Sequence, residues 1–278
     1  MATTAPEFLS IRGVSRSFPA TGGGAPTVAL QATDLAVAEN DFITILGPSG
    51  CGKSTLLRIV AGLDRQTSGE VLLEGRRIAG PGAERGMVFQ SYTLFPWLPV
   101  LDNVCFGLRE RGLPRAQQLE IAGAFLDKVG LRGFENHFPK QLSGGMQQRV
   151  AIARALAFQP AILLMDEPFG ALDEMTRERL NAEVLKVWAQ TGTTVIFVTH
   201  SIPEAVFLST RVVVMSARPG RISEVIDIDL PQPRGEDTRE TDRYYELVTQ
   251  VREALREGHS TAIPTASKDR ARAEGGIG

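Results

Sequence analysis

Short uninterrupted runs of apolar residues recur along the chain, and several of them end at a polar or charged side chain. Strands that are covered on both faces of a sheet carry such runs, because neither face meets water. The runs therefore predict a parallel sheet inside an α/β domain. Its strands are expected at 42–46, 86–90, 161–166, 193–199 and 211–215. A further short strand is expected at 69–75.

Residues 7–18 show a looser alternation of apolar and polar positions, which is typical of a half-exposed strand. The loop Gly22-Gly23-Gly24-Ala25-Pro26 then leads to a second strand near Val28. An antiparallel hairpin is therefore expected beside the parallel sheet.

The apolar spacing becomes helical between residues 91 and 159, as Ile121, Phe125 and Val129 illustrate. This change predicts a helical subdomain inserted into the sheet domain. The subdomain begins with an aromatic, proline-rich loop, in which Phe95 and Trp97 either anchor a partner or simply pack the subdomain.

The sheet domain is expected to span 7–230, and the composition becomes charged and proline-rich after it. Apolar residues at helical spacing predict one amphipathic helix within 231–259. The segment 260–278 has little to bury and is expected to be disordered, with no function assigned to it.

A glycine-rich stretch follows the first apolar run and precedes a predicted helix. It fits the pattern G-x-x-x-x-G-K-[ST] in the strand–turn–helix setting that a phosphate-binding loop requires. Its glycines let successive backbone N–H groups converge on one anion, and the helix N-terminus adds positive potential. Lys53 suits the β- and γ-phosphates, and the Ser54 hydroxyl suits Mg²⁺. The alternative is a chance turn; the stretch is Gly47, Pro48, Ser49, Gly50, Cys51, Gly52, Lys53, Ser54 and Thr55.

Polar side chains stand where the other parallel strands end, at Gln90, Asp166, Glu167 and His200. The carboxyl ends of parallel strands meet at the edge where such sheets bind ligands, so these side chains should converge with Lys53. Asp166 suits the Mg²⁺ shell, and Glu167 is placed to orient or deprotonate an attacking water. Each residue alone also fits an ordinary polar strand end.

Two further features fit a nucleotide. Ser143, Gly144 and Gly145 precede a helix and form a second anion cradle without a lysine, although Ser143 is equally a good helix N-cap. A phosphate in that cradle would need its counter-charge from elsewhere. Phe18 ends the first strand, where it either stacks on a nucleobase or packs locally.

The composition of the 278-residue chain narrows the choice of class. A net charge of −2 gives no general case for nucleic-acid binding. No apolar run approaches the ~20 residues that span a bilayer, and residues 1–6 do not look like a secretory signal. Cys51 and Cys105 lack metal-like spacing and fit a reducing compartment. A cytoplasmic protein is expected, so any membrane span would come from another chain.

With these motifs in hand, the chain resembles the ATP-binding subunits of ABC transporters over residues 7–225. The resemblance consists of the phosphate loop, the Gln90 loop, the signature Leu142-Ser143-Gly144-Gly145, the Asp166-Glu167 pair, the turn Ala171-Leu172-Asp173 and His200. Phe95-Pro96-Trp97 and Arg218-Pro219-Gly220-Arg221 look like the import branch that serves nitrate, sulfonate, taurine and related anions or thiamine precursors.

The resemblance implies a P-loop NTPase (RecA-like) core with an antiparallel β subdomain and an inserted α-helical subdomain. It also implies a head-to-tail dimer, in which ATP lies between the phosphate loop of one copy and the signature of the other. Glu167 is then the catalytic base and His200 senses the γ-phosphate, while Asp166 and Gln90 serve Mg²⁺. Asp173 communicates across the dimer, and Phe18, where the family often has tyrosine, stacks on adenine.

The leading hypothesis is therefore an ATPase that powers solute import at the cytoplasmic face of the inner membrane. By resemblance, its helical subdomain receives a transmembrane permease, and an external solute-binding protein acts indirectly. One alternative is a soluble ABC-type ATPase of DNA maintenance or translation, although the chain lacks the coiled-coil insertions or tandem cassettes of those relatives. Another is a nucleotide-binding regulator without turnover.

Overall fold

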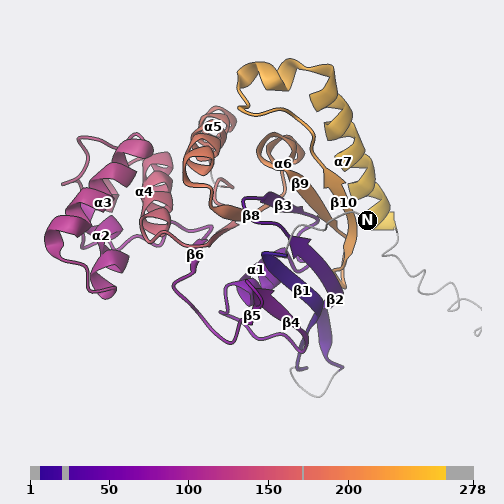
Figure 1. Ribbon diagram of the computed structural model, residues 1–278. Helices are drawn as coiled ribbons and strands as arrows, with labels where there is room; N and C mark the ends of the chain where they lie inside the picture. The colour runs from indigo at the N-terminus through magenta and orange to yellow at the C-terminus, as the bar shows by residue number, and fades with distance from the viewer. Residues whose placement is uncertain (1–6, 21–24, 171, 261–278) are drawn as a thin grey trace, which may run out of the picture.

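The computed structural model describes residues 7–20, 25–170 and 172–260. Within this part of the chain, a six-stranded sheet has the order β10-β9-β3-β8-β7-β6 (Figure 1). Its parallel strands are β3 (Phe42–Leu46), β6 (Arg85–Val88), β7 (Ile162–Asp166), β8 (Thr194–Thr199) and β9 (Arg211–Met215). These strands confirm the predicted parallel sheet, since β3, β7, β8 and β9 are almost wholly buried.

Two details of this sheet differ from the prediction. Strand β6 ends at Val88, so Gln90 lies two residues beyond the strand rather than at its end. A sixth strand, β10 (Ile222–Asp227), pairs antiparallel with β9, where no strand was expected from the sequence. Most of β10 is exposed, and so it lacks the long apolar run that marked its neighbours.

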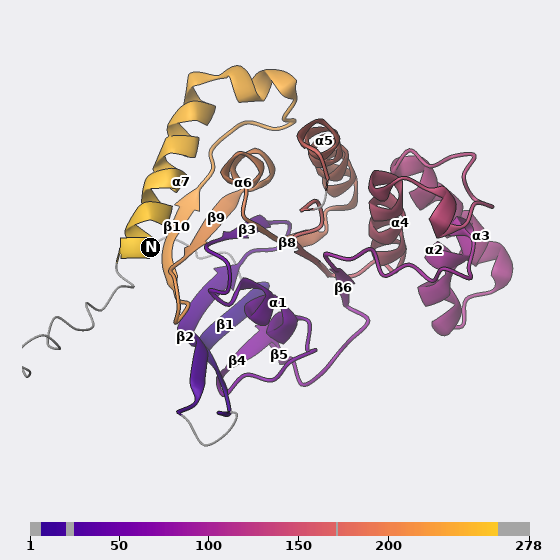
Figure 2. The ribbon, with the colours of Figure 1, turned by 180° about the vertical axis from the view of Figure 1, so that it is seen from behind.

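The predicted hairpin is confirmed as part of a second, antiparallel sheet with the order β2-β1-β4-β5. Its strands are β1 (Leu9–Phe18), β2 (Thr27–Val37), β4 (Ser68–Leu73) and β5 (Arg76–Arg77). The predicted glycine loop at 22–24 lies outside the described residues. Helix α1 (Lys53–Val60) lies between the two sheets, and one apolar cluster joins all three (Figures 1 and 2).

The inserted helical region contains α2 (Val100–Glu110), α3 (Arg115–Lys128), a 3₁₀ turn (Pro139–Gln141) and α4 (Gly144–Ala157). These helices form a lobe at one side of the sheets, and the chain enters the lobe from β6 and leaves it into β7 (Figure 1). The inserted α-helical subdomain predicted from the sequence is therefore confirmed.

The remaining helices cover the other face of the parallel sheet. They are α5 (Glu174–Thr191), α6 (Ile202–Leu208), a 3₁₀ turn (Glu236–Glu240) and α7 (Asp242–Ser260). Helix α7 contacts α6, β9 and β10, and its Tyr244, Leu247 and Val251 belong to the main apolar core. The predicted 260–278 tail lies outside the described residues except for Ser260. Among the described helices, none has the length and apolar content to cross a membrane.

Candidate nucleotide-binding site

The glycine-rich loop joins β3 to α1 and turns through two left-handed glycines. Gly50 has φ +74° and Gly52 has φ +100°, which L side chains rarely adopt. A Cβ on Gly52 would also lie 2.9 Å from the carbonyl oxygen of Ala29. The loop therefore needs glycine at these positions for both conformation and space.

A cleft of about 290 Å³ opens above this loop. Phe18 lies at its margin with 38% of its surface exposed, and Lys53, Ser54 and Glu167 belong to its wall. Such a cleft combines one aromatic face, a helix N-terminus and a cation, which are the groups that recognise a nucleotide. The full lining is Phe18, Thr27, Ala29, Ser49, Gly50, Gly52, Lys53, Ser54, Thr55, Glu167 and Arg218.

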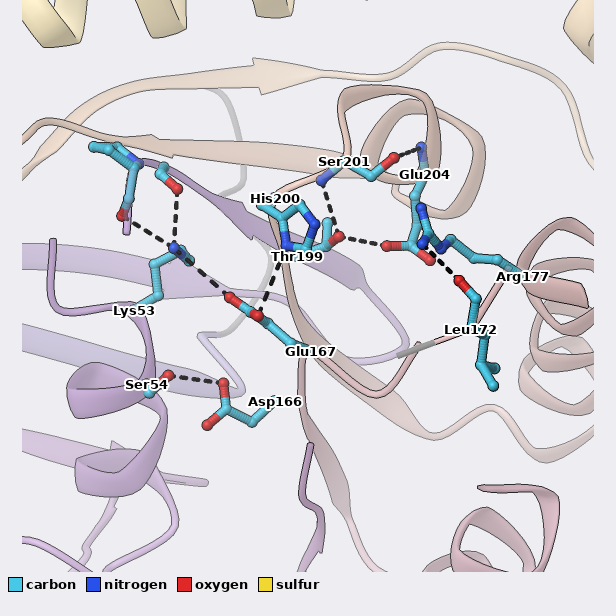
Figure 3. A network of polar contacts seen from close by, with 12 residues as sticks. Lys53, Ser54, Asp166, Glu167, Leu172, Arg177, Thr199, His200, Ser201 and Glu204 are labelled. Atoms are coloured by element: carbon cyan, nitrogen blue, oxygen red, sulfur yellow. Dashed lines mark hydrogen bonds and ion pairs between the residues drawn. The ribbon is translucent and has the colours of Figure 1, made fainter. Parts of the chain in front are cut away.

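Lys53 is only 5% exposed, and its ammonium group is held by neighbouring oxygens. Its Nζ donates to the carbonyls of Gly47 at 2.9 Å and Pro48 at 3.1 Å, and lies 4.0 Å from Glu167 Oε1. His200 Nδ1 lies 3.7 Å from the other carboxylate oxygen of Glu167 (Figure 3). Glu167 thus stands between the phosphate-loop lysine and the histidine that follows β8.

Asp166 faces the start of α1. The Ser54 hydroxyl donates to Asp166 Oδ1 over 2.8 Å (Figure 3). Burial raises the pKa of Asp166 above its ordinary value, and the hydrogen bond from Ser54 opposes that rise. Mg²⁺ is typically held by one or two protein oxygens together with phosphate and water oxygens, so this hydroxyl–carboxylate pair fits that ion.

Glu167 has an unusual backbone conformation for a residue with a side chain. Its φ is +43°, and its N–H donates to the Val198 carbonyl at 2.9 Å. Strand β7 ends at Asp166, and the left-handed turn at Glu167 brings its carboxylate to the same cleft. Strain of this kind is commonly kept at functional sites.

Gln90 does not join this chain of contacts. Its Nε2 lies 3.8 Å from the point where a Cβ on Gly170 would stand, near the turn after Glu167. It is therefore close to the same sheet edge, but it does not line the cleft.

The second predicted cradle lies apart from the cleft, on the helical lobe. Ser143 is the N-cap of α4, and its Oγ accepts from Met146 N at 3.3 Å. Asp173 is likewise the N-cap of α5, and the hydrogen bond from Thr176 N lowers the pKa of Asp173. Neither these two residues nor Gly144 and Gly145 line the cleft of their own chain. Ala171 lies outside the described residues.

Cys51 differs from its prediction as a cleft residue. Its side chain is fully buried in the apolar cluster under the loop, and burial raises the pKa of its thiol. Only its backbone remains to face a ligand. Gly47 and Pro48 do not line the cleft either. The direction of a loop side chain depends on φ and ψ, which the motif does not state.

Two features of the site were missed at the sequence level. Arg218 follows β9 and lines the cleft, whereas in the sequence it was noted only within the Arg218-Pro219-Gly220-Arg221 stretch that resembles the import branch. Glu204 of α6 is 4% exposed and accepts a hydrogen bond from Thr199, the last residue of β8 (Figure 3). A carboxylate one helical turn after His200 was the available signal for it.

Comparison with known proteins assigns the family. Residues 30–170 match the sequence profile described as ABC transporter. An uncharacterized ABC transporter ATP-binding protein of Methanocaldococcus jannaschii is 57% identical over 223 residues, which cover 80% of this chain and 84% of that protein. The nitrate import ATP-binding protein NrtD of Synechocystis is 46% identical, with coverage of 86% and 88%. The aliphatic sulfonates import ATP-binding protein SsuB of Bacillus cereus is also 46% identical, with coverage of 83% and 90%.

A solved structure gives the same assignment. The dimeric structure of an ATP-binding cassette in a post-hydrolysis state, bound to ADP and Pi, shares 33% identity and a TM-score of 0.70. It covers 82% of this chain, which spans 99% of that cassette. The chain belongs to the ABC transporter family, as an ATP-binding subunit.

Proposed function

We propose that this chain is the ATP-hydrolysing subunit of an importer for nitrate, a sulfonate or a related small anion, or for a thiamine precursor. The observation that carries the proposal is the Lys53–Glu167–His200 arrangement at the cleft, with contacts of 4.0 and 3.7 Å, beside the Ser54–Asp166 pair. The similarity to NrtD and SsuB, both named as import ATP-binding proteins, supports import and the class of solute.

Each residue has a distinct part in the proposed chemistry. Lys53 and the loop N–H groups bind the β- and γ-phosphates. Ser54, Asp166 and Gln90 would hold Mg²⁺, which would neutralise charge on the phosphates. Glu167 orients and deprotonates the attacking water, which places a proton on its carboxylate. His200, whose side chain is 58% exposed, contacts the γ-phosphate in this proposal.

Two copies complete the site in this proposal. The cradle of Ser143, Gly144 and Gly145 lies outside its own cleft, and so it is free to meet the γ-phosphate held by a second, head-to-tail copy. Asp173 would lie at the contact between copies, and Phe18 would stack on adenine. The dimeric cassette bound to ADP and Pi supports this arrangement.

The proposed membrane partner is a permease that docks on the helical lobe, with a solute-binding protein acting beyond it. Trp97 is 70% exposed, whereas Phe95 packs on Phe106 with ring centroids 4.4 Å apart. Phe95 thus packs within the lobe, while Trp97 is available as an interface anchor. The subunit would lie peripherally on the cytoplasmic face of the inner membrane. No observation favours the DNA-maintenance or translation alternative.

The variant Glu167→Gln tests the mechanism, because it keeps the shape of the side chain but removes the base. We expect ATP binding to persist, hydrolysis to fall by at least about 100-fold, and a dimer to accumulate on size exclusion with ATP and Mg²⁺. Glu120→Gln, on the exposed face of α3, is the matched control and should behave as wild type. A Glu167→Gln protein that stays monomeric with ATP and Mg²⁺ would refute the proposed clamp.

A further inference from the structure

The turn between β9 and β10 is packed directly on the phosphate loop. Gly220 N donates to the Ala29 carbonyl at 3.2 Å, and Gln31 N donates to the Gly220 carbonyl at 2.8 Å, so the turn is fastened to β2 (Figure 2). A Cβ on Gly220 would stand 1.7 Å from the Cys51 carbonyl oxygen. This turn therefore has a fixed place beside the loop.

Arg218 extends from this turn into the wall of the cleft. Its Nε donates to the Gly50 carbonyl over 2.6 Å, and its Nη2 lies 2.7 Å from where a Cβ on Gly50 would stand. The missing side chain of Gly50 thus leaves room for the guanidinium, in addition to meeting the conformational need of the loop.

The two cations of the cleft lining, Lys53 and Arg218, differ in their surroundings. Lys53 is buried and already contacts two carbonyls and the Glu167 carboxylate. Arg218 is exposed, and among the described residues no carboxylate lies within ion-pair distance of it. Its hydrogen bond to a neutral carbonyl uses Nε and leaves both terminal nitrogens available.

We infer that Arg218 is a nucleotide-binding residue that pairs with the phosphate chain, as a second cation beside Lys53. The loop N–H groups converge on the phosphates. The Arg218 guanidinium contacts the same loop, so a change of its side-chain rotamer brings it to the phosphates. The planar guanidinium can donate two hydrogen bonds to two oxygens of one phosphate group, whereas its present partner, the Gly50 carbonyl, is a single neutral acceptor. This role deepens the proposed function and rests on it, since it assumes that a nucleoside triphosphate occupies the cleft.

The inference predicts a loss that depends on the number of phosphates. Arg218→Ala should weaken ATP and ADP binding about tenfold but AMP binding by no more than about twofold, measured by calorimetry with Mg²⁺. The ATP and ADP affinities of Arg218→Lys should lie between those of wild type and Arg218→Ala. The matched control is Arg221→Ala, an exposed arginine of the same turn that does not line the cleft, and it should bind as wild type.

The outcomes separate this inference from the proposed function. Wild-type affinity of Arg218→Ala for ATP overturns the role of Arg218, and an equal loss for ATP and AMP overturns the assignment to the phosphate chain. A wild-type chain that binds no ATP would instead overturn the proposed function. Thermal unfolding without nucleotide should give the same midpoint for Arg218→Ala and Arg221→Ala, so a binding loss is not a folding loss.

Discussion

The variant Arg234→Ala should lower the free energy of unfolding by about 3 kcal/mol, because it removes hydrogen bonds to the carbonyls at the end of α6. Arg234 is only 7% exposed. Its Nη1 donates to the carbonyls of Val206, Phe207 and Ser209 at 2.8 to 3.2 Å, and its Nη2 donates to Leu230 at 3.2 Å. The last carbonyls of a helix lack hydrogen-bond donors within the helix, and here the Arg234 guanidinium is their donor.

The magnitude follows from these contacts. The Nη1 group has two hydrogens for three carbonyls, so three hydrogens in all serve the four acceptors. Hydrogen bonds from a charged donor contribute about 1.5 to 3 kcal/mol each. Burial lowers the pKa of Arg234 to about 10, which reflects the cost of placing its charge in the interior. Removal leaves the carbonyls unpaired but also relieves the cost of burying the charge, so the net loss is smaller than the sum of the hydrogen bonds, about 3 kcal/mol.

The assay is urea and thermal unfolding of the full chain, with the midpoint expected to fall by about 6 to 12 °C. Arg243→Ala is the control: Arg243 makes contacts of 2.9 to 3.0 Å with Asp229 and Glu246, but its side chain is 49% exposed. Exposed ion pairs contribute about 0 to 1 kcal/mol, so this variant should unfold nearly as wild type. If the two variants unfold within about 0.5 kcal/mol of each other, the reasoning from buried carbonyls is wrong.

Two further predictions concern buried titratable groups. Cys51 should resist iodoacetamide in the native chain at neutral pH, with or without ATP, because its thiol is fully buried and burial raises its pKa; rapid native labelling at Cys51, located by mass spectrometry, would contradict this. For Glu204, burial raises the pKa of the folded carboxyl above its unfolded value, so its contribution to stability is greatest at low pH and is lost as pH rises through the folded pKa. As the pH rises from about 5 to about 8, the free energy of unfolding of Glu204→Gln, measured in urea, should therefore increase relative to that of wild type. A difference between the two proteins that does not change with pH would show that the ionisation of Glu204 is not its cause.

The elements that sequence reasoning predicted well were those with a strong local signal. The buried run of β7 and the glycine pattern before Lys53 are each complete within a few residues. The convergence of Lys53, Glu167 and His200 also followed, because parallel strands place their carboxyl ends together.

What was missed depends on contacts between distant segments. The strand at β4 was expected, but its pairing with β1 places it in the antiparallel sheet, which its own six residues do not specify. Strand β10 is an exposed edge with little apolar pattern. Arg218 becomes a cleft residue only because its turn is fastened to β2, and neither segment indicates this alone.

The length of β7 has a consequence for the two adjacent carboxylates. Successive side chains of a strand point to opposite faces, so one more residue of regular strand would send the second acid away from its neighbour. Because the strand stops at Asp166 and the backbone reverses its handedness at Glu167, one short segment brings both carboxylates, the proposed Mg²⁺ ligand and the proposed base, to the same edge of the sheet. Inserting or deleting one residue here should therefore move the two carboxylates apart, even where the sheet itself survives.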